Sequence, residues 1–411
     1  MNFLNEIAGE YPNAISFASG RPAQQFFSLA HWLAQTDRFI SHFAQSCAND
    51  FEVASSLIGQ YGKTNGIVNE LIAQQQLRDE AIACDSSQLI VTAGCQEAMA
   101  LCAMELCKRP SDVLLVRSPT YIGITGIADL HGIELAPFRS EKDSELLPAL
   151  AATVEQAERC GKSPRALYLI PEFDNPTGTV LPKAYREQVI AYCARKRIAI
   201  LEDNPYGAFR FEGTAVPTMY TLDTSGCVIY LGTYSKTLCP AVRVGFILLP
   251  RRLFGDERAT VDLRERLSRR KSFLTVNTSQ IMQAMLGGVL LEERGSLARL
   301  IQPAREFYRR NRDLMLTALA AEFPQGQSIA AWNVPTGGFF LNVWLPFKFL
   351  RAEAEICARE LGVLTMPVSF FAFDDGHDQC VRLAFSNVDP ASIGEGIKRF
   401  ATFVRMQAGK P

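Results

Sequence analysis

Lys236 is the residue whose surroundings in this sequence point most directly to chemistry. It lies between two apolar runs, 227–231 and 244–249, that predict buried strands. An amine held between buried strands is costly unless it is paired, neutralised or chemically used, and one such use is a Schiff base with an aldehyde cofactor. Ser235 precedes the lysine. Arg243 follows it by seven residues, and its guanidinium could clamp a phosphate in bidentate fashion.

Two more polar segments follow apolar runs, and each has a structural and a chemical interpretation. Asn175 opens an Asn-Pro-Thr-Gly sequence after the run 166–170, and Asp203 follows the run 198–201, with Tyr206 three residues later. Both segments are typical of turns or helix caps. In chemical terms, an amide and a phenol could hold the oxygen of a planar ligand. A carboxylate could keep a pyridinium nitrogen protonated, which makes the ring an electron sink.

Three further positions could complete such a site. Gly94, Cys95 and Gln96 stand where a strand turns into a helix, so their backbone N–H groups could bind an anion, although a glycine there is also ordinary turn chemistry. Tyr121 could stack on a ligand ring or belong to the core. Arg382 lies in an alternating, strand-like segment and could grip a substrate carboxylate or be a solvated charge at a strand edge.

The elements that must position these residues alternate between strand-like and helical patterns. Apolar runs predict strands at 88–92, 113–116, 166–170, 198–201, 228–231 and 244–249. Because these runs are apolar throughout, both faces of the strands should be covered, which indicates a largely parallel sheet with helices outside. Such sheets bind ligands beyond the carboxyl ends of their strands, where the polar segments lie. Near residue 290 the pattern changes to a long helical stretch, with Pro303 as a candidate kink, and a smaller α+β domain.

The composition argues against several classes of function. The 411 residues are 48% hydrophobic, enough for two domains or one large one, and the net charge of −1 comes with no basic tract for nucleic acid. The sequence contains neither an apolar stretch long enough to span a membrane nor a signal-peptide pattern at its N-terminus. Eleven scattered cysteines and four histidines, without a Cys-x-x-Cys pair, indicate reduced thiols in the cytoplasm rather than a metal site.

Together, the Asn-Pro-Thr-Gly, Asp-x-x-Tyr and Ser-Lys-x-x-x-x-x-x-Arg motifs resemble those of the fold type I pyridoxal-phosphate aminotransferases of class I/II. The resemblance runs from about Ser16 to the C-terminus and is nearest the aminoadipate, kynurenine and aromatic transaminase branch. It implies an α/β fold, with a mostly parallel, seven-stranded sheet between helices in a large domain at 48–290. It also implies a small α+β domain at 291–411, joined by an N-terminal arm and substrate-covering segment at 1–47.

The resemblance further implies a role for each position. Lys236 would hold pyridoxal phosphate as a Schiff base and move a proton at the substrate Cα, and Asp203 would bind the ring nitrogen. The rest of the cofactor site would comprise Asn175 and Tyr206 at the ring oxygen, Tyr121 stacked on the ring, and Gly94, Cys95, Gln96, Ser235 and Arg243 around the phosphate. Tyr61 would reach the phosphate of the neighbouring subunit in a homodimer. The substrate α-carboxylate would bind Arg382 and Asn175, with Gly20 and Arg21 in the covering segment.

The implied reaction exchanges an amino group between an amino acid and a 2-oxo acid in two ping-pong half-reactions, and some departures from the family pattern bear on it. Arg21 stands where relatives often have an apolar residue, so it could read an acidic group on a substrate or acceptor, or be solvated. Asp174 replaces a residue that is often glutamine, and it could alter the ring electronics or face solvent. Val368 could narrow the pocket or merely pack.

Other activities stay open at this point. Elimination, cyclisation, decarboxylation and oxygen-dependent oxidation of amino acids use the same lysine and aspartate on this scaffold. A transcription regulator or a non-catalytic sensor domain is a more distant alternative, because the sequence shows no basic helix pair before the covering segment. The amino donor is not assigned. Five phenylalanines hint at an apolar-lined pocket, although all of them could instead belong to the core: Phe17, Phe26, Phe27, Phe370 and Phe371.

Overall fold

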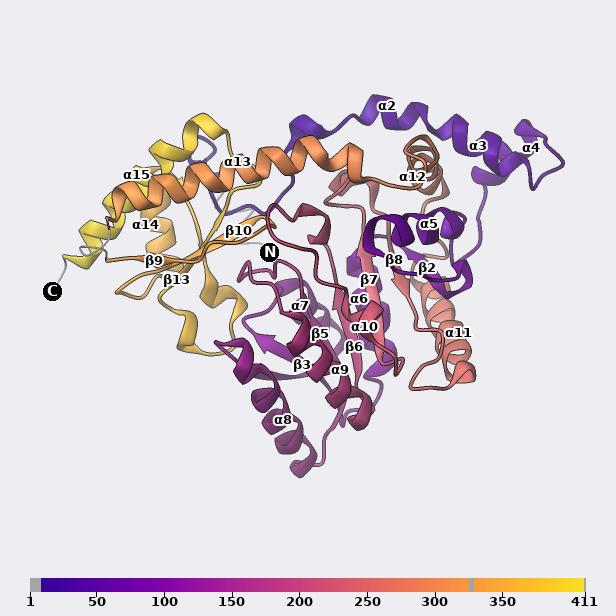
Figure 1. Ribbon diagram of the computed structural model, residues 1–411, viewed down its shortest axis with the longest axis horizontal. Helices are drawn as coiled ribbons and strands as arrows, with labels where there is room; N and C mark the ends of the chain where they lie inside the picture. Colours follow the sequence, from indigo (N-terminus) through magenta and orange to yellow (C-terminus); the bar gives the residue numbers. More distant parts are fainter. Residues whose placement is uncertain (1–8, 325–328, 410–411) are drawn as a thin grey trace.

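One large sheet organises the computed structural model, which describes residues 9–324 and 329–409 (Figure 1). Its seven strands lie in the order β2-β8-β7-β6-β5-β3-β4. β8 is antiparallel to both neighbours, and the other four neighbouring pairs are parallel, so the predicted largely parallel sheet is confirmed. The strands are β2 (Leu89–Thr92), β3 (Asp112–Ser118), β4 (Glu134–Arg139), β5 (Ser163–Leu169), β6 (Ala199–Asp203), β7 (Val228–Thr233) and β8 (Gly245–Leu248).

Helices cover both faces of this sheet, as the uninterrupted apolar runs predicted. Successive residues of β5 point to opposite faces: Ala166 and Tyr168 join one apolar cluster, whereas Leu167 and Leu169 join another. The first cluster includes side chains of α6, and the second includes side chains of α8 and α9. The helices of this part are α5 (Asn69–Glu80), α6 (Cys95–Leu106), α7 (Ile122–His131), α8 (Asp143–Arg159), α9 (Lys183–Lys196), α10 (Met219–Leu222), α11 (Glu257–Leu274) and α12 (Gln280–Glu292).

A second, four-stranded antiparallel sheet follows later in the chain, in the order β12-β13-β10-β9. The long helices α13 and α15 pack against each other next to it (Figure 1). Its strands are β9 (Ala331–Trp332), β10 (Phe340–Trp344), β12 (Met366–Pro367) and β13 (Cys380–Ala384). Its helices are α13 (Ala298–Glu322), α14 (Arg351–Leu361) and α15 (Pro390–Ala408).

The N-terminal segment connects these two parts. Its strand β1 (Ile15–Ser16) pairs in parallel with β11 (Val363–Leu364), and its helices α2 (Leu29–Ala34), α3 (Thr36–Ala44) and α4 (Phe51–Ile58) contact α12. This arrangement supports the division at 47/48 and 290/291, which stays a proposal.

Three details differ from the sequence patterns. β4 was not predicted, because its apolar stretch is short, contains Pro137 and is flanked by the exposed charges of Glu134 and Arg139. β6 extends two residues beyond the predicted end, so that Asp203 is its last residue. Pro303 lies inside α13, which continues as one helix from Ala298 to Glu322.

Candidate active site

A cavity of about 610 Å³ opens where β5, β6 and β7 end, and most of the predicted site residues line it. These are Gly20, Arg21, Cys95, Gln96, Tyr121, Asn175, Asp203, Tyr206, Ser235, Lys236, Arg243 and Arg382. They come from the N-terminal segment, the large sheet and the second sheet. Residues separated by more than 360 positions therefore share one site.

Lys236 projects its amine into this cavity. Its Nζ donates to the backbone oxygen of Gly20 at 3.1 Å and lies 5.9 Å from the centre of the Tyr206 ring. Burial lowers the pKa of Lys236 to about 8, and the nearby cations, Arg382 first among them, act in the same direction. About one tenth of the lysine is then neutral at pH 7, far more than in an exposed side chain. Such an amine can act as a nucleophile or a base near neutral pH.

Asp203 lies in the interior at the end of β6. Its Oδ2 accepts a hydrogen bond from the Tyr168 hydroxyl at 2.6 Å, and its Oδ1 accepts one from the Cys95 thiol at 3.2 Å. Burial raises the pKa of Asp203 to about 6, although both donors and Lys236 oppose the rise. The carboxylate is therefore ionised at neutral pH and basic enough to hold a proton on a ring nitrogen.

One end of the cavity is built to bind an anion. Helix α6 begins at Cys95, and its N-cap, Gly94, supplies no side-chain cap, so the first N–H groups of the helix are available to a ligand. Arg243 Nη1 donates to Ser235 Oγ at 3.3 Å, and its Nη2 donates to Ala93 O at 3.1 Å. Gly94 has φ +80°, and a Cβ there would lie 2.4 Å from Arg243 Nη2, so a glycine is required for the guanidinium to approach this closely.

Arg382 is buried in β13, so its interpretation as a solvated strand-edge charge is wrong. Its Nη1 donates to Asn175 Oδ1 at 2.6 Å, its Nη2 donates to Ala18 O at 2.7 Å, and its Nε is buried with no partner. The rings of Phe340 and Phe371 lie 4.2 and 4.9 Å from the guanidinium carbon. Burial lowers the pKa of Arg382 to about 10, so the group stays charged at neutral pH. A rigid cation facing a cavity is suited to an incoming carboxylate.

Four further positions differ in their exposure and in whether they reach the cavity. Tyr121 lines the cavity, and burial raises the pKa of its hydroxyl to about 12. Tyr61 is 80% exposed and does not line the cavity of this chain. Val368 is fully buried and packs in the core. Arg21 is exposed and lies at the cavity wall.

The five phenylalanines differ in where they lie. Phe371 lines the cavity, but the other four phenylalanines do not. Phe17 is fully buried in the core, and Phe26 packs edge-on against Phe307.

Several lining residues were missed by the sequence reasoning: Ser16, Ser19, Met99, Ile122, Phe340 and Asn387. Tyr168, which bonds Asp203, was also missed because it lies within an apolar strand. A tyrosine hydroxyl in an otherwise apolar run needs a buried partner, and that was the available signal.

The cavity fits pyridoxal phosphate. The α6 N-terminus, Ser235 and Arg243 form a cradle for a phosphate, and Asp203 offers a carboxylate for the ring nitrogen. Lys236 offers an amine for the aldehyde, and Asn175 and Tyr206 offer donors for the ring oxygen. Among the described residues, no cluster of potential metal ligands and no helix able to cross a membrane is found.

Comparisons with known proteins agree with this chemistry. The family model for aminotransferase class I and II matches residues 15–400. The chain is 37% identical to the (S)-3,5-dihydroxyphenylglycine transaminase of Amycolatopsis orientalis, over 98% of this chain and 91% of that protein. It is 27% identical to the 2-aminoadipate transaminase of Thermus thermophilus, over 94% of this chain and 89% of that protein.

Among solved structures, the multiple substrate aminotransferase of Thermococcus profundus superposes with a TM-score of 0.84 at 25% identity. The match covers 99% of this chain and 94% of that one. The chain therefore belongs to the class I and II aminotransferases and is a fold type I, pyridoxal-phosphate-dependent transaminase.

Proposed function

We propose that Lys236 is the residue that attaches the cofactor and moves the proton during transamination of an amino acid with a 2-oxo acid. The observation that carries this assignment is that its amine shares one cavity with a phosphate cradle and a buried carboxylate. Its lowered pKa supports the role, because only a neutral amine can accept the proton from a substrate Cα.

The other residues act on the cofactor or the substrate. Pyridoxal phosphate supplies an aldehyde that binds a primary amine and a ring that withdraws electrons from the carbon bearing it. Asp203 would keep the ring nitrogen protonated, and Tyr206 and Asn175 would donate to the ring oxygen. Ser235, Arg243 and the backbone N–H groups of Cys95 and Gln96, which follow Gly94, would hold the phosphate. Tyr121 would contact the ring.

Arg382 and Asn175 bind the α-carboxylate of the substrate, and their mutual hydrogen bond orients the pair. Gly20, whose backbone oxygen contacts Lys236, belongs to the segment that covers the substrate and excludes water. Arg21, beside it, reads an acidic group on the donor or on an acceptor such as 2-oxoglutarate. Replacement of Arg21 with Leu should raise the KM of acidic substrates and leave the KM of neutral substrates unchanged. Unchanged kinetics with every acidic substrate would refute this role.

For the amino donor we propose an amino acid with a hydroxylated aromatic side chain. The cavity combines apolar surfaces of Ile122, Phe340 and Phe371 with polar groups of Ser16 and Ser19. The relative at 37% identity is named for a dihydroxyphenylglycine, whose ring needs both kinds of contact. A panel of amino acids mixed with the cofactor-loaded protein, read as loss of its visible absorption, ranks the donors. A preference for aliphatic donors over all aromatic ones would refute the assignment.

A homodimer is the proposed working unit. Tyr61, Phe273, Val276 and Ile281 are large apolar side chains that are 46–84% exposed. The loop containing Tyr61 is held beside the last two, since Gln280 donates to Gln60 O. Such a surface is typical of a subunit interface, and it supports the role of Tyr61 at the partner's phosphate.

A cytoplasmic location is proposed as well, because all eleven cysteines are free.

One experiment tests the central assignment. Borohydride reduction of the cofactor-loaded protein, followed by peptide mass mapping, should place the pyridoxyl group on Lys236. Lys236→Ala should lose both turnover and visible absorption, whereas Lys183→Ala, an exposed lysine of α9, should keep both. A label on another lysine, or turnover by the Lys236 variant, would refute the mechanism.

A further inference from the structure

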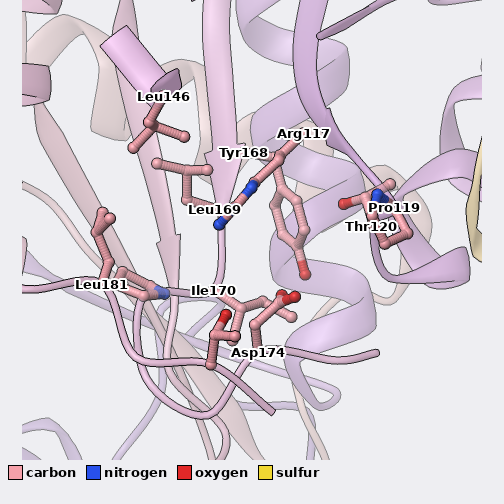
Figure 2. A pocket seen from close by; sticks show the side chains of 11 residues that line it. Arg117, Pro119, Thr120, Leu146, Tyr168, Leu169, Ile170, Asp174 and Leu181 are labelled. Atoms are coloured by element: carbon pink, nitrogen blue, oxygen red, sulfur yellow. The ribbon is translucent and has the colours of Figure 1, made fainter. Parts of the chain in front are cut away.

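A second, much smaller cavity of about 20 Å³ borders the site at Tyr168. Its polar lining includes Tyr168, Asp174, Arg117 and Thr179, and the rest is mainly apolar. Figure 2 shows the Asp174 carboxylate and the Tyr168 hydroxyl pointing toward the same end of this cavity. The volume exceeds the roughly 10–15 Å³ that one water molecule needs, and the lining offers the two to four polar partners that a buried water requires.

Asp174 is fixed at the cavity by its own turn. Its Oδ2 accepts from the Thr177 hydroxyl at 2.7 Å, and its backbone oxygen accepts from Gly178 N at 2.7 Å. Arg117 lies at the same cavity, and its Nη2 donates a hydrogen bond to Ser140 O at 2.9 Å. The half-buried carboxylate thus has an accepting oxygen left for a further donor.

Tyr168 connects the cavity to the cofactor site. A phenol has one proton to donate, and Tyr168 gives it to Asp203 Oδ2 at 2.6 Å. Toward the cavity its oxygen can therefore only accept. A water molecule between Tyr168 and Asp174 would have two acceptors, one for each of its protons.

The charge of Asp174 also acts on Asp203. Asp174 raises the pKa of Asp203, in the same direction as burial. The carboxylate is the stronger of the two acceptors, so the water donates less strongly to Tyr168, and the Tyr168 hydroxyl then donates less strongly to Asp203. Both effects leave Asp203 with a higher affinity for a proton.

We propose that this cavity holds one ordered water that bridges Asp174 and Tyr168, and that Asp174 acts through it as a positioning residue that keeps the Asp203 carboxylate basic toward the cofactor ring nitrogen. The proposal rests on the role assigned to Asp203 above. It accounts for an acidic residue before Asn175, where the resemblance to the family predicts a glutamine. Asp174 is half-buried and lines this cavity, which favours the interpretation that it acts on the ring electronics.

The test is a pH titration of the holoenzyme loaded with pyridoxal phosphate that carries ¹⁵N at the ring. In Asp174→Asn, the pH at which the ring nitrogen loses its proton should fall by up to about one unit. In Tyr168→Phe the bridge is cut, so adding Asp174→Asn should shift the midpoint by less than half as much. Glu187→Gln, which neutralises an exposed carboxylate of α9, should shift nothing. An unchanged midpoint in Asp174→Asn, or equal shifts in both backgrounds, would overturn the proposal.

A second measurement does not depend on the variants. A crystal structure of the unaltered protein at a resolution that resolves waters should show one peak within hydrogen-bond distance of both Asp174 and Tyr168. A cavity filled by side chains, or without that peak, would overturn the proposal even if the variants fail to fold. If peptide mapping instead places the cofactor away from Lys236, the proposed function fails, and the water peak still reports on the bridge.

Discussion

Gly20→Ala is predicted to disturb the site through a contact that is read directly from the structure. A Cβ at Gly20 would lie 2.3 Å from Phe340 Cζ and 2.4 Å from its Cε1. Carbon atoms in contact normally lie about 3.5–4.0 Å apart. Either Phe340 or the covering segment must therefore move by more than about 1 Å.

Neither movement is free. Phe340 is 1% exposed, lies edge-on to Tyr206 with ring centres 5.7 Å apart, and packs on the Arg382 guanidinium. Overpacking of this kind costs about 1–3 kcal/mol. If the covering segment lifts instead, Gly20 O leaves Lys236 Nζ, which it contacts at 3.1 Å. Either outcome misplaces the substrate carboxylate or the amine, and a cost of about 1.4 kcal/mol on the transition state lowers kcat/KM about tenfold.

The assay combines denaturant unfolding with steady-state kinetics. Gly20→Ala should lower both the unfolding midpoint and kcat/KM, and adding Phe340→Leu should restore part of the stability by making room. Gly126→Ala is the matched control, because a Cβ there meets nothing within 4 Å and the site lies in α7. Native stability and native kcat/KM in Gly20→Ala would refute the reasoning.

Charge and exposure lead to three more predictions. Folding lowers the pKa of Lys236 from 10.5 to about 8, so the unfolded chain binds more protons between these values. The free energy of unfolding of the cofactor-free protein should therefore rise with pH across this window, and denaturant unfolding of Lys236→Met should lack that rise. Asp203, with a pKa of about 6, loses its charge as pH falls through 6. The affinity for the cofactor, measured by fluorescence, should therefore fall in the native protein as the pH drops through 6. In Asp203→Asn the affinity should not change across this pH range. Phe273→Glu should split the dimer in sedimentation experiments, whereas Leu130→Glu, at a comparably exposed position, should not; a monomeric native protein would contradict the proposed interface.

The fold was accessible from the sequence wherever burial is uniform along a strand. Apolar runs predicted the strands from β2 to β8 except β4, which lies at the sheet edge with polar residues facing water. The antiparallel direction of β8 could not be predicted from its residues. Its side chains are buried on both faces, as are those of the parallel strands in the same sheet.

The site could be predicted in part, for a related reason. Lys236, Asp203 and Asn175 follow apolar runs, and parallel strands end at one edge, so their meeting could be inferred. The hydrogen bond from Tyr168 to Asp203 could not be inferred, since it joins side chains of two neighbouring strands that are distant in the sequence.

The sequence by itself determined which chemical groups this protein has and which of them follow the ends of strands. Apolar runs and turn residues can be recognised from neighbouring residues alone, so these features are visible in the sequence. Only the tertiary structure decided the state of those groups. The lowered pKa of Lys236 and the pairing of Arg382 with Asn175 require low-dielectric surroundings assembled from segments hundreds of residues apart. The pattern of residues along the chain does not show which distant segments come into contact.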